Sequence, residues 1–142
     1  MVKHEILKGK DRVLVFDPDG EWTKLKGYYT ITCGANVNVA LEELRQVLND
    51  NWDSSFKVVF VPLPGREIEL LHEVSQLLMQ FQTPFFDETH DLLVDFVVDE
   101  IADSCKTHMK EEYNGFLLVA RRGAKRGITA VMITQSPQGV NL

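Results

Sequence analysis

Five short apolar segments recur along the chain, and segments with helical spacing separate most of them. The apolar segments are rich in β-branched residues, and turn formers such as Pro18, Gly20 and Pro62 close them. We expect strands over residues 12–17, 28–33, 56–61, 92–98 and 128–134. Strands that alternate with helices need crossover connections, which give a parallel sheet with helices on both faces. The pattern therefore predicts an α/β fold with three layers and a mainly parallel sheet, formed by residues 1–142 as a single domain.

Three helices are expected between these strands. The first has apolar residues over 41–48 on one face, and Asn38 is its expected N-cap. The second covers residues 68–81, and the third covers residues 113–120, with Gly123 near its end. The segment 28–33 alternates enough between apolar and polar residues to predict an edge strand.

The composition excludes several classes of protein. Hydrophobic residues make up 44% of the chain and charged residues 25%, which is typical of a soluble globular protein. The formal net charge of −6 excludes coating of nucleic acid through bulk charge, but leaves room for a local basic patch. The apolar runs are shorter than the roughly 18 residues that cross a bilayer, so we expect no membrane insertion. Two distant cysteines form no disulfide framework, and we expect a cytoplasmic protein.

Acidic residues follow the strand at 92–98. This strand ends in FVVDE, which puts Asp99 and Glu100 at the tip of a buried strand, where ligands of parallel sheets bind. A buried acidic pair is costly unless it is paired or used, for example to hold Mg²⁺ and to activate water. The residues fit a second interpretation equally well, because Asp and Glu are favoured at a helix N-terminus.

Polar residues also follow the first and the last strand. The first strand ends in DPDGEW, so Asp17, Asp19 and Glu21 bring three carboxylates to the same edge of the sheet. A solvated turn explains the same residues, since Pro, Asp and Gly are turn formers. The last strand is followed by TQSPQG, in which Gln135 can hydrogen-bond a γ-phosphate or its water, or can be an ordinary loop residue.

A basic cluster stands out in this acidic chain. The segment ARRGAKRG carries Arg121, Arg122, Lys125 and Arg126. Cations at a helix C-terminus complement the helix dipole, which is the structural interpretation. The functional interpretations are a contact to phosphate or DNA, or an arginine offered to the nucleotide of a neighbouring subunit.

The chain resembles the HerA/FtsK-type P-loop ATPases in the order of its segments, which are RVLVFDPDGEW, FKVVFVP, LLVDFVVDE, ARRGAKRG and ITAVMITQSPQG. That superfamily includes DNA translocases, viral genome-packaging ATPases and the Zot-like assembly proteins of filamentous phages. The resemblance covers roughly residues 2–140 and is best over 92–139. It implies a RecA-like core that uses Mg²⁺ and ATP and assembles into rings, with DNA bound through the basic cluster.

The resemblance assigns a role to each acidic candidate. Asp99 would be the acid associated with Mg²⁺, and Glu100 would be the catalytic base. Gln135 would be the sensor at the tip of the last strand. Asp17 and Glu21 would match the D-P-x-x-E motif of the family, at the nucleotide.

The basic cluster would supply the remaining family feature. Arg122 or Arg126 would be the arginine finger that acts across a subunit boundary. The partner implied by this role is a second copy of the chain, or a missing segment of the same protein.

One motif of the family is absent. The 142 residues contain no G-x-x-x-x-G-K-[ST] loop, because Asp11 follows the Gly9-Lys10 pair. We expect a chain that begins after the phosphate-binding loop, lacks the first strand of the core, and by itself binds neither Mg²⁺ nor ATP tightly. The absent strand would leave a slot between residues 92–98 and 128–134. Either these two strands close up, or another segment fills the gap.

Two other functions fit parts of the pattern. The chain can be a non-catalytic interaction module that keeps the ATPase fold without its chemistry. VLVFDPDGEW also resembles the start of HAD phosphohydrolases, with Asp17 as nucleophile and Asp19 as acid and base. Glu21 stands where that family has Thr.

Overall fold

The computed structural model describes residues 7–99 and 115–133. The elements in chain order are β1 (Arg12–Phe16), η1 (Glu21–Lys24), β2 (Tyr29–Thr32), α2 (Val37–Asn51), β3 (Phe56–Val61), α3 (Glu67–Phe81), α4 (Thr83–Phe86), β4 (Val94–Asp99), α6 (Gly115–Arg122), η3 (Gly123–Arg126) and β5 (Ile128–Ile133).

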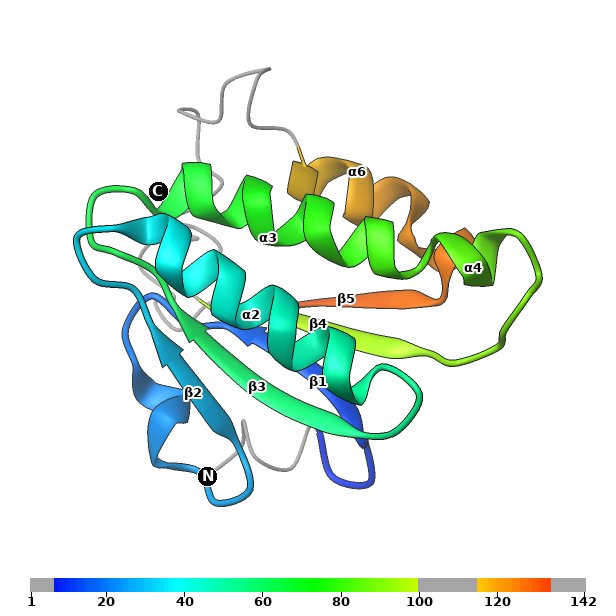
Figure 1. Cartoon of the computed structure of the whole chain (residues 1–142), viewed down its shortest axis with the longest axis horizontal. Helices are drawn as coiled ribbons and strands as arrows, with labels where there is room; N and C mark the ends of the chain where they lie inside the picture. Colours follow the sequence, from blue (N-terminus) through cyan, green and yellow to red (C-terminus); the bar gives the residue numbers. More distant parts are fainter. Residues whose placement is uncertain (1–6, 100–114, 134–142) are drawn as a thin grey trace, which may run out of the picture.

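The strands form one five-stranded sheet in the order β2-β3-β1-β4-β5 (Figure 1). Every neighbouring pair is parallel. The prediction of an α/β fold with a mainly parallel sheet is therefore confirmed. The segment 28–33, expected at an edge, contains β2 and lies at an edge of the sheet.

The strand order explains where the helices lie. The connections from β2 to β3, from β3 to β4 and from β4 to β5 all step across the sheet in the same direction. Because such crossovers are right-handed, α2, α3 and α6 are placed on the same face. The step from β1 to β2 goes the opposite way and places η1 on the other face. In the described residues, Leu7 and η1 form the cover of that second face.

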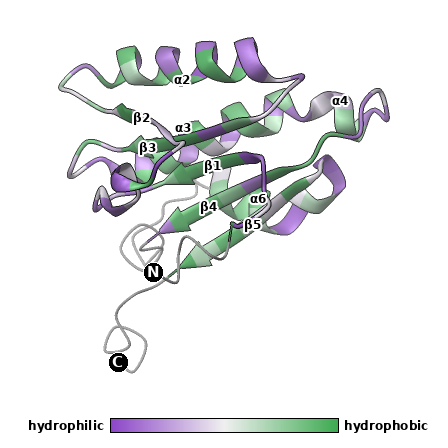
Figure 2. Cartoon of the chain, turned by 90° about the horizontal axis from the view of Figure 1, so that it is seen from below, coloured by the Kyte–Doolittle hydropathy of each residue, from purple (hydrophilic) through white to green (hydrophobic). Residues whose placement is uncertain are grey.

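Alternate residues of each strand enter two different cores. Leu14, Phe16 and Phe96 pack against the three helices, whereas Val15 and Val97 pack on the second face. The central strand β1 is buried along its whole length. In Figure 2 it is mostly hydrophobic in colour, whereas the helices carry both hydrophobic and hydrophilic residues. A strand buried on both faces needs an almost continuous apolar run, which is why RVLVF lacks the alternation seen in β2.

The slot expected between the acidic strand and the last strand is not present. β4 and β5 pair directly, in register from Val94 with Ile128 to Asp99 with Ile133. The two strands have closed up, which is the first of the two outcomes that the sequence allowed.

The expected N-cap of the first helix is wrong by two residues. α2 is capped by Asn36, whose side chain accepts a hydrogen bond from the backbone N–H of Asn38 at 3.2 Å. Asn38 lies inside the helix because Asn36 is the residue with extended backbone angles, as an N-cap requires.

Arg12 connects neighbouring segments at the end of the sheet where the strands begin. Its side chain is almost fully buried, and it donates to the carbonyl oxygens of Leu93 at 2.9 Å, of Ser54 at 2.6 Å and of Trp52. The guanidinium lies 4.8 Å from the ring centroid of Trp52 and 5.0 Å from that of Phe56. Burial lowers the pKa of Arg12 from its ordinary value. The cation therefore joins the starts of β1, β3 and β4.

Gln82 connects the segments that precede β4 and β5, at the same end of the sheet. It follows α3, is fully buried, and donates its side-chain N–H groups to the carbonyl oxygens of Leu92 at 2.9 Å and Arg126 at 2.7 Å. Those two residues lie just before β4 and β5. One amide thus sets the spacing of the two strands where they begin.

We expect the isosteric substitution Gln82→Glu to lower the free energy of unfolding by about 3 kcal/mol at neutral pH, because a buried carboxylate would face two carbonyl oxygens. Urea denaturation measures the difference. The control is Gln76→Glu, at an exposed position of α3, which should change stability little. Equal stability of the two variants would contradict the role given to Gln82.

Candidate functional site

Two buried carboxylates meet at the edge of the sheet where the strands end. Asp17 directly follows β1, and Asp99 is the last residue of the neighbouring strand β4. The register pairs Phe16 with Val98, so the two aspartates come next on adjacent strands. Both side chains are 0% exposed. The structure thus brings together the two acids that the sequence singled out at this edge.

Trp22 of η1 contacts both carboxylates. Its backbone N–H donates to Oδ2 of Asp17 at 2.8 Å, and its indole Nε1–H donates to Oδ2 of Asp99 at 2.8 Å. The indole is 1% exposed and packs with Val15 and Val97 on the second face of the sheet. One tryptophan therefore satisfies an oxygen of each acid and covers the strand ends with apolar surface.

The DPDG sequence explains how Trp22 reaches this position. Asp17 extends the ladder of β1 by donating its N–H to the carbonyl oxygen of Phe60 at 2.9 Å. The chain then turns, and Gly20 takes the left-handed conformation with φ 71 directly before η1. Glycine adopts such a φ without steric cost, so the turn can bring η1 back over the sheet.

The three carboxylates of DPDGEW do not act as one group. Asp17 is buried, whereas Asp19 and Glu21 are exposed. Two other candidates, Glu100 and Gln135, lie outside the described residues.

The basic cluster lies at the other end of the strands, where they begin. α6 ends beside the starts of the strands, since the carbonyl of Arg126 accepts from Gln82 and the carbonyl of Gly127 accepts from the N–H of Val94. Arg122 and Arg126 are therefore separated from Asp17 and Asp99 by the length of the strands. Within one chain these arginines do not serve the acidic edge.

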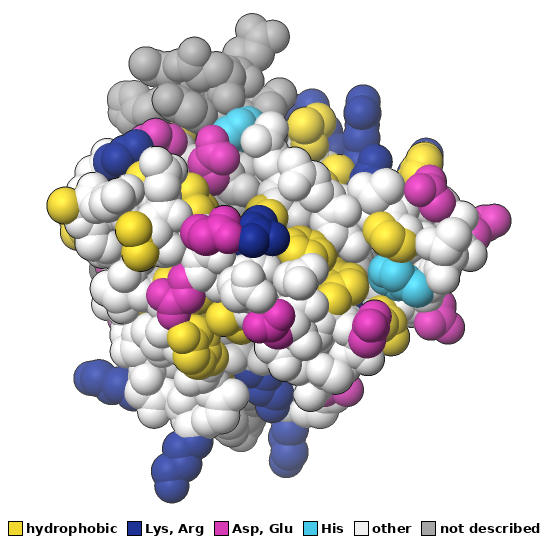
Figure 3. Space-filling view, in the orientation of Figure 1, with side chains coloured by type: hydrophobic (Ala, Val, Ile, Leu, Met, Phe, Trp, Pro, Cys, Tyr) yellow, Lys and Arg dark blue, Asp and Glu magenta, His cyan; other side chains and the backbone are white. Residues whose placement is uncertain are grey.

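The basic residues surround a hollow. Arg122, Lys125 and Arg126 line it together with Phe86, and its volume is about 390 Å³. The guanidinium of Arg126 lies 4.8 Å from the ring centroid of Phe86, which is 52% exposed. Figure 3 shows dark blue side chains gathered beside α6. The hollow combines positive charge with an exposed aromatic ring.

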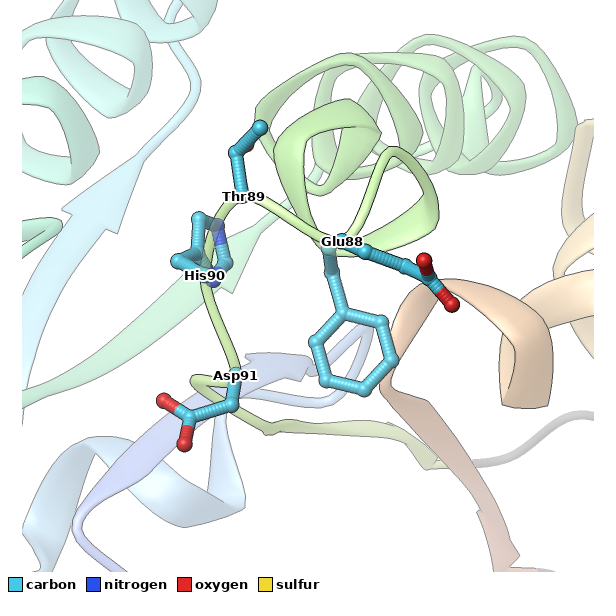
Figure 4. A pocket seen from close by; sticks show the side chains of 5 residues that line it. Glu88, Thr89, His90 and Asp91 are labelled. Atoms are coloured by element: carbon cyan, nitrogen blue, oxygen red, sulfur yellow. The ribbon is translucent and has the colours of Figure 1, made fainter.

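A second hollow, of about 480 Å³, lies between α4 and β4 (Figure 4). The carboxylates of Glu88 and Asp91 point away from each other there. His90 accepts a hydrogen bond from the N–H of Leu92 at 3.1 Å through Nδ1. Within residues 7–99 and 115–133, no three His, Cys, Asp or Glu side chains come together as a metal site requires.

Sequence reasoning missed Trp22 and Arg12. The signal for Trp22 was present, because a large aromatic residue five positions after a strand-ending aspartate must be buried somewhere. Its target, Asp99, is 77 residues away, and no local pattern reveals that contact.

Comparisons with known proteins give a distant structural similarity. No protein family and no curated protein matches the sequence. A solved structure of EssC (ATPases 2 and 3) from Geobacillus thermodenitrificans is similar with a TM-score of 0.40 and 18% identity. The similarity covers 92% of this chain and 29% of that chain, so the chain spans less than a third of the EssC chain. A similarity of this size assigns neither a family nor a function. None of the helices within the described ranges is long and apolar enough to cross a membrane.

The bond between Trp22 and Asp99 is tested by a double-mutant cycle. We expect Trp22→Phe to lower the free energy of unfolding by about 2 kcal/mol, because it leaves a buried carboxylate without its indole donor. The loss should shrink when Asp99 is already replaced by leucine, because the bond no longer exists.

Trp52→Phe is the matched control for this cycle. Trp52 is also buried, but its indole nitrogen has no hydrogen-bond partner among the described residues. The control removes a similar ring area without removing a hydrogen bond. Independence of the effects of Trp22→Phe and Asp99→Leu would show that the bond contributes nothing.

Proposed function

We propose that this chain is an ATPase-type α/β domain, of the kind found in motors that translocate DNA, package genomes or assemble phages. We further propose that these 142 residues act as a non-hydrolytic interaction module, because Trp22 takes up the carboxylates that would otherwise serve Mg²⁺ and water. The observation that carries the proposal is the pair of 2.8 Å hydrogen bonds from Trp22 to Asp17 and Asp99.

The position of the acids supports the ATPase-type assignment. Ligands of parallel α/β sheets bind outside the carboxyl ends of the strands, and both aspartates lie there on neighbouring strands. In the motif order given above, Asp99 would be the acid associated with Mg²⁺, Glu100 the base and Gln135 the sensor. Asp17 and Glu21 would complete the acidic motif at the nucleotide.

The burial of the acids supports the absence of hydrolysis. Mg²⁺ keeps several of its waters and binds carboxylates that those waters can reach. Asp99 is 0% exposed, and its Oδ2 already accepts the indole N–H. A Mg²⁺ ion would therefore have to compete with the indole for Oδ2 and reach a carboxylate that is buried.

The distribution of charge points the same way. A nucleoside triphosphate needs cationic groups and backbone N–H donors around its phosphates, and the sequence has no phosphate-binding loop with its lysine. Asp17, Asp19 and Glu21 would repel a polyanion at this edge, whereas the basic cluster lies at the other end of the strands. The same burial of Asp17 disfavours an HAD-type nucleophile, which must reach the phosphorus atom of its substrate.

Removal of the indole tests whether it covers a latent metal site. In the variant Trp22→Leu, we expect Mn²⁺, used as a paramagnetic substitute for Mg²⁺, to bind with a dissociation constant below about 1 mM, which the unmodified chain should not reach. Addition of Asp99→Asn should weaken that binding about tenfold, because the ion loses a charged ligand. Water-proton relaxation measures binding, and circular dichroism checks that each variant is folded.

The unmodified chain provides the second arm. We expect it to bind neither Mn²⁺ nor Mg·ATP with a dissociation constant below about 1 mM, and to leave a simple aryl phosphate unhydrolysed. Micromolar binding of Mg·ATP would contradict the non-hydrolytic role. Mg²⁺-dependent hydrolysis of the phosphomonoester, lost in Asp17→Asn, would replace the proposal by the HAD-type reaction. A folded Trp22→Leu variant without Mn²⁺ binding would contradict the latent site.

The basic cluster is the proposed contact to DNA. We expect weak binding that falls steeply with salt, because counterions are released from the phosphates. Replacing Arg122 and Lys125 by glutamine should lower the salt slope by about 2, which is close to one unit for each phosphate that is no longer neutralised. Fluorescence anisotropy of a labelled duplex gives the slope.

The control variant replaces Lys24 and Lys26, two exposed lysines near η1, by glutamine. It makes the same change in net charge away from the basic hollow. Equal slopes for the two variants, or an affinity that does not change when salt rises fourfold, would return the cluster to its role at the helix end.

A further inference from the structure

Among the described residues, β5 is an edge strand that lacks the usual protection. In the described part of the chain it pairs only with β4. Natural proteins protect sheet edges with lysine, proline, bulges or very short strands. β5 reads ITAVMI over six residues and carries no charge, no proline and no glycine. Its free edge is therefore suited to pairing with another strand.

The backbone of β5 shows which groups are free to pair. The N–H of Val94 donates to the carbonyl oxygen of Gly127. In a parallel ladder, alternate residues direct their N–H and C=O groups to the same neighbour. Gly127, Thr129 and Val131 therefore face β4, and Ile128, Ala130 and Met132 direct their backbone groups outward.

An apolar groove of about 360 Å³ runs beside this edge, between β5 and α6. Small side chains, including Ala120, Ala124 and Ala130, form part of its wall. Leu93 and Met132 also line it and are 60% and 56% exposed. The groove has room for an apolar side chain that arrives together with a pairing strand.

The other edge of the sheet is better protected. β2 has only four residues, and the exposed Lys24 and Lys26 precede it. The hydroxyl of Tyr29 donates to Glu43 of α2 at 2.6 Å. Lys57 of the neighbouring strand lies 5.9 Å from the ring centroid of Tyr28. Charges therefore surround β2, whereas none lies within β5.

We propose that β5 pairs with β5 of a second copy, antiparallel and about a two-fold axis at Ala130, so that two sheets join into one. Because Ile128, Ala130 and Met132 all direct their backbone groups outward, Ala130 then faces Ala130 of the partner subunit, and Ile128 faces Met132 of the partner subunit. Met132 of each copy would then be covered by the groove of the other copy, at the end of that groove where Leu93 lies. The interface does not depend on the proposed function.

Charge favours the antiparallel arrangement over a parallel one. Arg121, Arg122, Lys125 and Arg126 lie near the start of β5. Antiparallel pairing puts the two basic clusters at opposite ends of a six-residue strand, roughly 20 Å apart. That separation exceeds the Debye length of about 8 Å at physiological salt, so the repulsion is largely screened. A parallel arrangement would place the clusters side by side.

Analytical ultracentrifugation tests the interface with two matched variants. We expect the unmodified chain and Val39→Lys to form dimers, and Met132→Lys to be monomeric, because a lysine at this edge prevents strand pairing. Val39 is 63% exposed on α2, far from β5, so it controls for adding one lysine at an exposed apolar position. A monomeric unmodified chain, or equal dimerisation of the two variants, would overturn the proposal.

Amide hydrogen exchange identifies the strand in contact. The N–H of Ala130 should exchange more slowly as protein concentration rises from the monomer range to the dimer range. The N–H of Val131, which faces β4, should change little. Dimerisation without added protection at Ala130 would place the interface elsewhere and overturn the proposal. Open-ended assembly, which pairing of β5 with β2 of another copy would produce, would also overturn it.

Discussion

The central strand β1 is buried on both faces and carries a charged residue at each end. Arg12 and Asp17 flank the apolar run, and both side chains are buried. A buried ionised group is costly unless hydrogen bonds satisfy it. Arg12 donates through Nε and Nη1 to carbonyl groups before β4 and β3, and Asp17 accepts the N–H of Trp22 through Oδ2. The hydrogen bonds that these two buried charged residues need thus position the neighbouring segments at both ends of β1.

The use of the carboxylates for structure bears directly on function. An acid that binds Mg²⁺ or activates water must be open to solvent in at least one state of the protein. Here the indole of Trp22 occupies Asp99 and lies in the core of the second face. A protein that keeps acids at this edge while covering them has the arrangement that the proposed non-hydrolytic role requires.

Much of the fold could be predicted from the sequence, because the strands are short, apolar and closed by turn residues. The strand at 56–61 has the predicted bounds, and the last strand begins at the predicted residue. The side on which each helix lies could not be predicted, because it follows from the strand order, and no local pattern encodes that order. The N-cap was misplaced because Asn36 and Asn38 are equally good caps by residue type, and only the backbone angles distinguish them.

The candidate site was predictable in position but not in state. Strand-ending aspartates indicate the carboxyl edge of a parallel sheet, and Asp17 and Asp99 do meet there. Their occupation by Trp22 depends on a contact across 77 residues.

The central claim is that the indole of Trp22 stays on Asp99 when nucleotide is present. The chain has two tryptophans, so a ¹H–¹⁵N spectrum contains two indole signals, which a Trp52→Phe variant assigns. We expect the Trp22 Nε1–H to be strongly protected from hydrogen exchange, and its chemical shift and exchange rate to stay unchanged when Mg·ATP is added. Fast exchange of this proton, or a shift that saturates with Mg·ATP, would contradict the account.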